Sequence, residues 1–218
     1  MKSEIKYYLK SPVRHKIQAI RGLCNGKTVL DIGCVGQDKF YDNPGWLHHH
    51  IKQTASELTG VDIVTEHKAI LASKGYTLLS PEELKNSGKT VDVIVMADVI
   101  EHVSNTAEFL LFYRQFLKPG GQIVVTTPNP FSIRRVMSVL LYGNPGVNPE
   151  HTQWLDPLTM DELLSRLDFK IQYFCWLHEY SKPHKLRYYF LYPFFQIIYS
   201  FRKFFAPNFL MVITSAKA

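Results

Sequence analysis

Residues 28–36 read TVLDIGCVG, an apolar run that contains one acid and, toward its end, the glycines Gly33 and Gly36. This run predicts a buried strand followed by a turn, because glycine lets a ligand approach the main chain closely. A second run, VDVIVMA at residues 91–97, is nearly continuous in apolar residues. Such continuity is typical of a parallel strand that is covered on both faces. Both runs therefore predict buried strands of a parallel sheet.

Strand and helix patterns alternate on either side of these runs. We expect further strands at residues 58–63, 76–79, 122–127, 170–176 and 209–215. Helices are expected at residues 12–22, 46–58, 65–74, 81–85 and 105–117, and from Thr159 onward. Capping-box patterns at Asn105 and Thr159 open the last two. This alternation predicts an α/β fold with a doubly wound, mostly parallel sheet of seven strands.

The length of 218 residues favours a single domain over residues 1–218. We expect a helical segment at residues 1–25 and a basic, aromatic, helical insertion at residues 178–207, before the last strand. Three widely spaced cysteines, Cys24, Cys34 and Cys175, exclude a disulfide framework and a zinc-binding spacing. No apolar stretch is long enough to cross a membrane, and the first residues lack a signal-peptide pattern. A cytoplasmic protein is expected.

The positive charge is confined to one end of the chain. Lysine and arginine total 25 against 19 acids, which gives a formal net charge of +6. No acid follows Glu179, whereas six lysines and arginines do, so residues 1–179 are balanced. A nucleic-acid-binding domain usually carries its excess charge across a face of its body. This distribution argues against a nucleic-acid partner.

Acids recur where predicted strands end. Asp31 lies near the end of the first strand, Asp62 near the end of the second, and ADVIEH at residues 97–102 follows the strand at 91–97. In open α/β sheets, ligands bind outside the carboxyl ends of the strands. These three segments are therefore expected to border one ligand site.

Four motifs occur together in this chain: VLDIGC at residues 29–34, GVDI at 60–63, VDVIVMADVIEHV at 91–103 and FLKPGGQIVVTTPNP at 116–130. In this order and spacing they resemble the class I S-adenosylmethionine-dependent methyltransferases, of the small type similar to ubiquinone-biosynthesis O-methyltransferases. The resemblance covers residues 27–130 and, more loosely, 150–175. It implies a Rossmann-like fold, S-adenosylmethionine as cofactor and S-adenosylhomocysteine as product.

The resemblance also implies which residues contact the cofactor. The turn after the first strand would face its methionine part, Asp62 its ribose and Ile63 its adenine, while Ser80 would border the adenine amine. The expected cofactor-binding residues are Asp31, Gly33, Cys34, Gly36, Asp62, Ile63, Ser80, Ala97, Asp98 and Val99. A dinucleotide-binding site is disfavoured, because it needs three glycines and Asp31 would repel a pyrophosphate.

Two positions depart from the family pattern. Val35 and Gln37 stand where relatives usually carry glycine. A valine side chain there would crowd the cofactor, unless Gly36 supplies the turn one residue later. The departures leave an alternative open, a non-catalytic methyltransferase-like scaffold whose aromatic tail binds a membrane or a partner.

Asp98, Glu101 and His102 have a spacing that would place all three on one face of a helix. Relatives with a similar arrangement use magnesium on a catechol-like substrate, so a magnesium site is one interpretation. A general base at His102 and a structural role are the others, and we predict no metal ligand. His151, near Trp154, is a second candidate base. The run His48, His49 and His50 cannot chelate one ion, because successive helical side chains diverge by about 100°.

Residues 188–205 read YYFLYPFFQIIYSFRKFF and are flanked by basic residues. Three interpretations stay open for this segment: a hydrophobic lid or homodimer surface, a peripheral contact with the inner face of the membrane, and plain core. The function expected overall is methyl transfer, at oxygen, to a small-molecule, lipid-like or glycan acceptor. A lipid-linked acceptor would be compatible with both a lid and a membrane contact in this segment.

Overall fold

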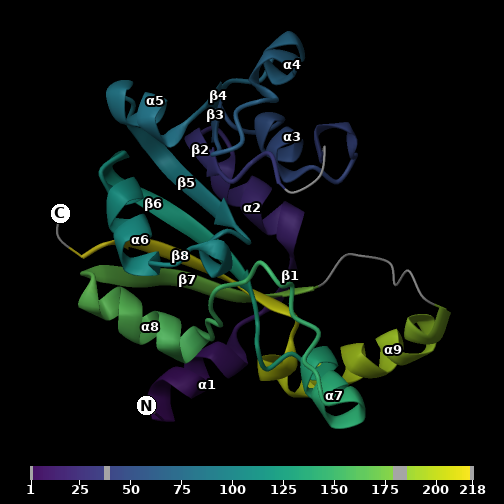
Figure 1. Cartoon of the computed structure of the whole chain (residues 1–218). Coiled ribbons are helices and arrows are strands. Elements are labelled where there is room, and N and C mark those ends of the chain that lie inside the picture. Colours follow the sequence, from purple (N-terminus) through teal and green to yellow (C-terminus); the bar gives the residue numbers. More distant parts are fainter. Residues whose placement is uncertain (1, 37–39, 179–185, 217–218) are drawn as a thin grey trace.

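A single eight-stranded sheet forms the centre of the computed structural model, which describes residues 2–36, 40–178 and 186–216 (Figure 1). Gln37 and residues 179–185 of the expected insertion lie outside these ranges. The strand order is β1-β7-β8-β6-β5-β2-β3-β4, and β8 is antiparallel to both neighbours while the other pairs are parallel. The strands are β1 Val13–His15, β2 Thr28–Ile32, β3 Glu57–Val61, β4 Leu78–Leu79, β5 Val91–Ala97, β6 Leu117–Pro128, β7 Phe169–His178 and β8 Asn208–Ser215.

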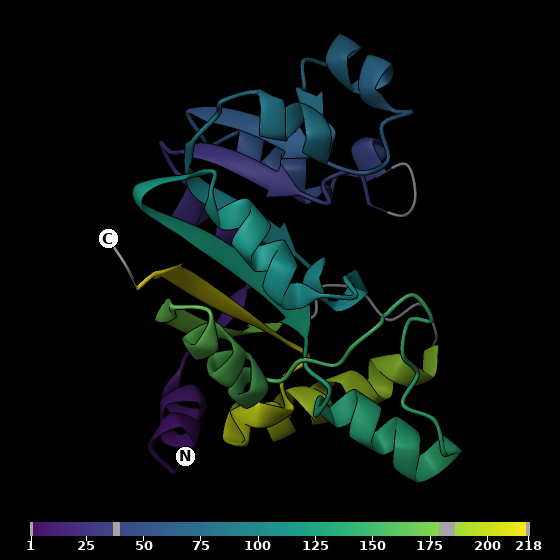
Figure 2. The ribbon, with the colours of Figure 1, turned by 60° about the vertical axis from the view of Figure 1, so that its left-hand side comes forward.

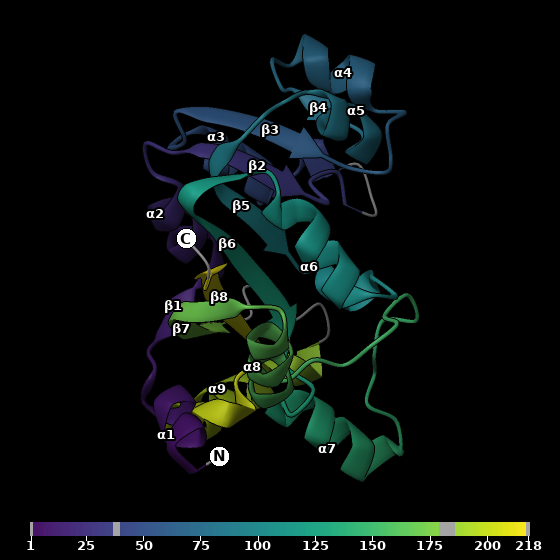
Figure 3. The same ribbon diagram turned by 90° about the vertical axis from the view of Figure 1, so that its left-hand side faces the viewer.

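Helices cover both faces of this sheet, as Figures 2 and 3 show. One face carries α1, α5, α6 and α8, which bury Tyr8, Leu84, Leu110 and Met160 in the larger core. The other carries α2 and α3, whose Ile20 and Ile51 belong to a second core. The helices are α1 Lys2–Lys10, α2 Lys16–Cys24, α3 Leu47–Lys52, α4 Lys68–Ser73, α5 Pro81–Asn86, α6 Thr106–Arg114, α7 Ile133–Tyr142, α8 Pro157–Arg166 and α9 Leu186–Phe201, with short 3-10 helices η1 Phe40–Asp42, η2 Ile100–His102 and η3 Lys203–Phe205.

The α/β fold and the mostly parallel sheet are as predicted, with one more strand than expected. Val13 to His15 pair with Trp176 to His178 as the edge strand β1, so the helix expected over residues 12–22 begins only at Lys16. The indole of Trp176 also donates to the Tyr8 carbonyl at 2.7 Å. These contacts stabilise the start of the chain against β7, so the expected helical segment at residues 1–25 is two helices flanking a strand.

Two predicted helices have different limits in the structure. The helix expected over residues 46–58 was wrong in its second half, because α3 ends at Lys52 and the Ser56 amide donates to the Lys27 carbonyl before β3 begins. The capping box expected at Thr159 lies three residues earlier. Asp156 caps α8, since its carboxylate accepts from the Leu158 and Thr159 amides. In both cases hydrogen bonds from main-chain amides, which the apolar pattern does not reveal, decide where the helix begins or ends.

The carboxyl ends of the strands carry most of the structure that the sequence patterns did not predict. Helix α7 follows β6, and α9 with η3 forms the predicted helical insertion before β8. Figures 1 and 3 show α7 and α9 side by side beyond the end of β6. Within the described ranges, every helix is too short or too polar to span a bilayer. Helices α7 and α9 therefore lie together at the carboxyl end of β6.

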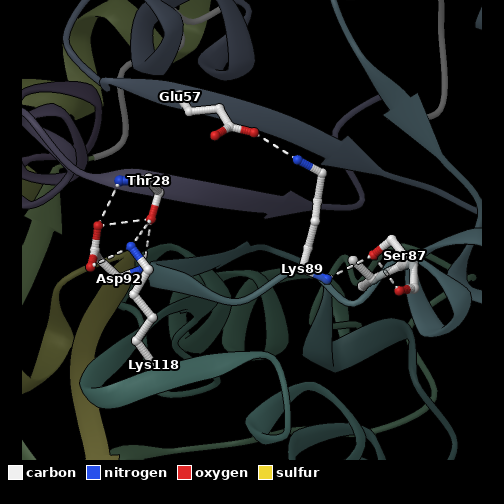
Figure 4. A network of polar contacts seen from close by, with 7 residues as sticks. Thr28, Glu57, Ser87, Lys89, Asp92 and Lys118 are labelled. Atoms are coloured by element: carbon white, nitrogen blue, oxygen red, sulfur yellow. Dashed lines mark hydrogen bonds and ion pairs between the residues drawn. The ribbon is translucent and has the colours of Figure 1, made fainter.

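The opposite end of the sheet is joined by a polar network, drawn in Figure 4. The Asp92 carboxylate accepts hydrogen bonds from the Thr28 amide at 2.9 Å, the Thr28 hydroxyl at 2.7 Å and the Lys118 ammonium at 3.1 Å. These contacts lower the pKa of Asp92 to about 2, the Thr28 main-chain hydrogen bond contributing most. The network therefore connects β2, β5 and β6 where they begin.

Asp92→Asn is expected to lower the melting temperature by about 2–4 °C at neutral pH, which corresponds to about 1 kcal/mol in a chain of this size. Because the folded-state pKa is depressed, the Asp92 contribution is fully present above the unfolded pKa of about 4 and is lost as the pH falls toward 2. Thermal melts of both proteins between pH 7 and 2.5 would measure it. Glu57→Gln, which removes the exposed ion pair with Lys89, is the matched control. A difference that stays constant down to pH 2.5 would contradict the assignment.

Candidate active site

The ends of β2 and β5 meet at Gly33. Strands β3 and β4 lie on one side of β2, and after β4 the chain crosses to form β5 on the other side. Gly33 has a φ of 71°, and a Cβ atom there would lie 2.7 Å from Cγ2 of Val99. Any side chain would therefore disturb both strand ends. The predicted turn at Gly33 and the predicted segment Ala97 to Val99 are thus brought together.

Asp62 connects this turn to β3. Its carboxylate accepts from the Val35 amide at 2.9 Å and the Val64 amide at 3.0 Å, and its side chain is buried. The neighbouring Ile63 is 84% exposed. The side chain of Val35 is 2% exposed and packs in a small core with Trp46. The Val35 side chain therefore lies in the protein interior and not on the surface of the turn.

A buried pair that the sequence patterns did not reveal supports the same turn. His48 Nδ1 lies 2.8 Å from the Asp31 carboxylate, and both side chains are almost inaccessible. The Trp46 indole donates to the Cys34 carbonyl at 2.7 Å. Of the histidine run, His49 contacts the Tyr76 hydroxyl and His50 the Pro44 carbonyl, so the three rings have separate partners.

Ser80 and Cys34 each have a structural role. The Ser80 hydroxyl accepts from the Glu83 amide at 3.1 Å as the N-cap of α5, next to the point where the Asp62 amide donates to the Leu79 carbonyl. Burial, followed by the Asp31 and Asp62 carboxylates, raises the pKa of the Cys34 thiol well above its ordinary value. The thiol is therefore suited to packing rather than to nucleophilic chemistry.

Asp98 occupies a backbone conformation that is rare for residues other than glycine, with a φ of 56°. The Thr126 hydroxyl donates to its carboxylate at 2.8 Å, and Lys16 of α2 forms an ion pair with it. Burial alone would raise the pKa of Asp98, but the Lys16 ammonium and these hydrogen bonds hold it below its ordinary value. No sequence motif pointed to Lys16, which reaches Asp98 from a distant part of the chain.

The two candidate bases lie together. The His102 and His151 rings have centroids 4.7 Å apart and cross edge to face. Burial, followed by His102 and Arg135, lowers the pKa of His151, which favours the neutral form of its ring. Beside them, burial and then the Asp98 carboxylate raise the pKa of Glu101 to about 8. The stretch before α8 is held here by the Thr152 amide, which donates to the Glu101 carbonyl at 2.9 Å.

A pocket of about 400 Å³ opens at Asp98 and extends between α7 and α9. Its wall is mixed in character, with two guanidinium groups on α7 and apolar or aromatic side chains on both helices. Residues that define it are Asp98, Arg134, Arg135, Leu141, Tyr142 and Phe195. Because Asp98 directly follows β5, the pocket begins at the carboxyl end of that strand.

Comparison with known proteins gives one family. The family described as a methyltransferase domain matches residues 5–173. The ubiquinone biosynthesis O-methyltransferase of Rhizobium leguminosarum is 33% identical over 112 residues, which are 48% of this chain and 41% of the relative. Its mitochondrial counterpart in Rattus norvegicus is 28% identical over 156 residues, 66% of this chain and 43% of the relative. The chain thus spans less than half the length of these relatives.

Solved structures share the fold. A SAM-dependent methyltransferase from Archaeoglobus fulgidus has a TM-score of 0.58 at 21% identity, covering 91% of this chain and 90% of that one. The magnesium protoporphyrin IX methyltransferase of Synechocystis, solved with bound SAH, has a TM-score of 0.59 at 12% identity, covering 92% of this chain and 82% of that one. At these identities the likeness concerns the arrangement of the sheet and its helices.

Proposed function

Because the chain belongs to the methyltransferase-domain family, we propose that it transfers the methyl group of S-adenosylmethionine to an oxygen atom of an amphipathic small molecule. The observation that carries the acceptor class is the pocket between α7 and α9, which begins at Asp98 and has a partly apolar wall. A polar end of the acceptor would lie near Asp98 and an apolar end between the helices. The named relatives act on oxygen, which supports the choice of a hydroxyl acceptor.

The cofactor is proposed to bind across the ends of β2, β3 and β5. Its methionine part would lie on the turn after β2, its ribose at Asp62 and its adenine against the exposed Ile63. The sulfonium end would then lie near Asp98, at the entrance to the pocket. The proposed contacts are Asp31, Gly33, Cys34, Gly36, Asp62, Ile63, Ser80, Ala97, Asp98 and Val99.

In this arrangement the acceptor oxygen attacks the methyl carbon in line with the sulfur. The oxygen–carbon bond forms as the carbon–sulfur bond breaks, and neutral S-adenosylhomocysteine leaves. A hydroxyl acceptor must also lose a proton, and we propose that His151, with His102 beside it, accepts it, because the lowered pKa of His151 favours the unprotonated ring. Most of the rate enhancement would come from holding donor and acceptor close and in line.

The test is a transfer assay with S-adenosylmethionine labelled in its methyl group. Long-chain alkyl phenols and alcohols serve as acceptors, and phenol without a chain serves as the comparison. We expect label in the organic phase and preference for the chain-bearing compounds. Binding of S-adenosylmethionine without transfer to any hydroxyl compound would overturn the acceptor class. Absence of S-adenosylmethionine binding would overturn the function itself.

The scaffold alternative depended on Val35 and Gln37. Val35 packs in the protein interior with its amide hydrogen-bonded to Asp62, so its side chain leaves the face of the turn to a ligand. Gln37 lies outside the described residues. We therefore retain the enzyme as the proposed function.

The acceptor is further proposed to come from a lipid surface. Helices α7 and α9 expose large apolar side chains next to the pocket, among them Leu140, Phe194, Ile197 and Phe201. No acid occurs between Glu108 and Glu150 or after Glu179, whereas α7 contains Arg134 and Arg135. Apolar side chains with basic neighbours suit the interface of an anionic membrane. Other aromatics of the segment, Phe195, Phe204 and Phe205, pack against the core.

Replacing Leu140, Phe194, Ile197 and Phe201 by serine is expected to weaken binding to vesicles with anionic lipids at least about tenfold, since each exposed apolar side chain contributes on the order of 1 kcal/mol when it enters a membrane. Co-sedimentation at low salt measures this effect. Ile70→Ser with Leu111→Ser, which removes exposed apolar groups on α4 and α6, is the matched control. Unchanged vesicle binding, or loss of a dimer by light scattering in its place, would contradict the membrane proposal and favour a homodimer surface.

A further inference from the structure

Three side chains that bind metals well in proteins come together beside the pocket. Glu101 and His102 belong to η2, directly after β5, and His151 lies in the stretch between α7 and α8. One potential ligand atom from each lies within 4.8 Å of the others. The stretch with His151 is held against η2 by Thr152 and by Gln153, whose amide donates to the Ile100 and Val103 carbonyls at 3.0 and 2.7 Å. The grouping is therefore built into the fold.

The Glu101 carboxyl group is incompletely satisfied. Its side chain is 2% exposed, and its Oε2 accepts from the Thr127 hydroxyl at 3.0 Å. Its Oε1 has no hydrogen-bond partner. A buried oxygen without a partner costs free energy that a bound ligand would recover. This unpaired oxygen is the second, independent observation that indicates a ligand at the cluster.

The donor set does not fit magnesium. The resemblance implied a magnesium site at Asp98, Glu101 and His102, but Asp98 is already paired with Lys16 and hydrogen-bonded by Thr126. His151 takes the third place in the cluster, which leaves one carboxylate and two imidazoles. Magnesium prefers oxygen ligands and water, whereas imidazole nitrogen favours zinc and other divalent transition metals.

We propose that Glu101, His102 and His151 bind a divalent transition-metal ion, with zinc as the representative case, where the chain leaves β5. This site goes beyond the proposed function, because methyl transfer with a histidine base needs no metal. With such an ion bound, the two imidazoles would be ligands and would no longer serve as the base. The ion would instead supply Lewis-acid chemistry that lowers the pKa of a nearby hydroxyl group. Lys16 then has a distinct role, since its pairing with Asp98 keeps that carboxylate out of the ligand set.

The test measures metal binding without reference to activity. The full chain, freed of metal by dialysis against a chelator, is titrated with Zn²⁺ and with Mg²⁺ by calorimetry, and with Co²⁺ by visible absorption. We expect one Zn²⁺ per chain at micromolar or lower Kd, cobalt bands typical of nitrogen and oxygen ligands, and no binding of Mg²⁺ at millimolar concentration. Glu101→Gln and His151→Ala should each weaken zinc binding at least about tenfold.

The exposed His49 and the half-buried His50 provide the control. His49→Ala with His50→Ala removes two imidazoles elsewhere on the chain and should leave the zinc affinity unchanged. Thermal melts without metal show whether each variant is folded, and Glu101→Gln keeps the shape of the side chain where His151→Ala does not. Zinc binding lost in the His49 and His50 variant but kept in Glu101→Gln would overturn the proposal. So would magnesium binding equal to that of zinc, or no zinc binding at all.

Discussion

Replacing Asp62 by alanine is expected to reduce the affinity for S-adenosylmethionine at least about hundredfold. Hydrogen bonds between a carboxylate and two ribose hydroxyls are worth about 3 kcal/mol together, which is roughly a hundredfold in Kd. The carboxylate is also the acceptor for the Val35 and Val64 amides, so the alanine variant loosens the turn that would face the methionine part. Calorimetric titration with S-adenosylmethionine and S-adenosylhomocysteine measures the loss for both ligands.

Glu66→Ala is the matched control for Asp62→Ala. Glu66 is an exposed acid four residues along the chain, so it changes the charge equally without touching the turn. Melts without ligand separate a loss of binding from a loss of folded protein. If Asp62→Ala stays folded and binds S-adenosylmethionine as tightly as the unchanged chain, the proposed placement of the ribose is wrong.

Sequence reasoning reached the family, the Rossmann-like fold and S-adenosylmethionine as cofactor, and the comparisons confirm all three. It succeeded because the decisive signals are local. The apolar runs at residues 28–32 and 91–97 are typical of parallel strands that are buried on both faces, with helices on either side of the sheet. Asp31 lies near the end of the first run, and Asp62 and Asp98 directly follow β3 and β5, so the sheet itself brings the three acids to one edge.

What could not be predicted depends on partners far apart in the sequence. Val13 to His15 form a strand because Trp176 to His178 offer a free edge, which no local pattern reveals. Lys16 meets Asp98, and His151 meets His102, only after the sheet and α7 are in place. Helix α7 itself was not predicted, and neither was its place against α9, which forms the pocket.

His48→Leu is expected to destabilise the protein by about 3 kcal/mol, a drop of roughly 6–12 °C in melting temperature for a chain of this size. The substitution keeps an apolar side chain against Trp46 and Tyr76 but leaves the Asp31 carboxyl group buried without its partner. Thermal and urea unfolding measure the change. His49→Leu, in which only contacts of an exposed ring are lost, should shift the melting temperature far less.

The double variant Asp31→Val with His48→Leu decides whether the pair or the packing is responsible. Removing both partners leaves no buried polar group unpaired, so the double variant should recover at least about half of the stability lost in His48→Leu. If the two losses simply add, His48 acts only as a packing residue. If the double variant is stable but does not bind S-adenosylmethionine, the Asp31 carboxylate itself is needed for the cofactor. The fold would then be intact, and only the acid of the turn would be missing.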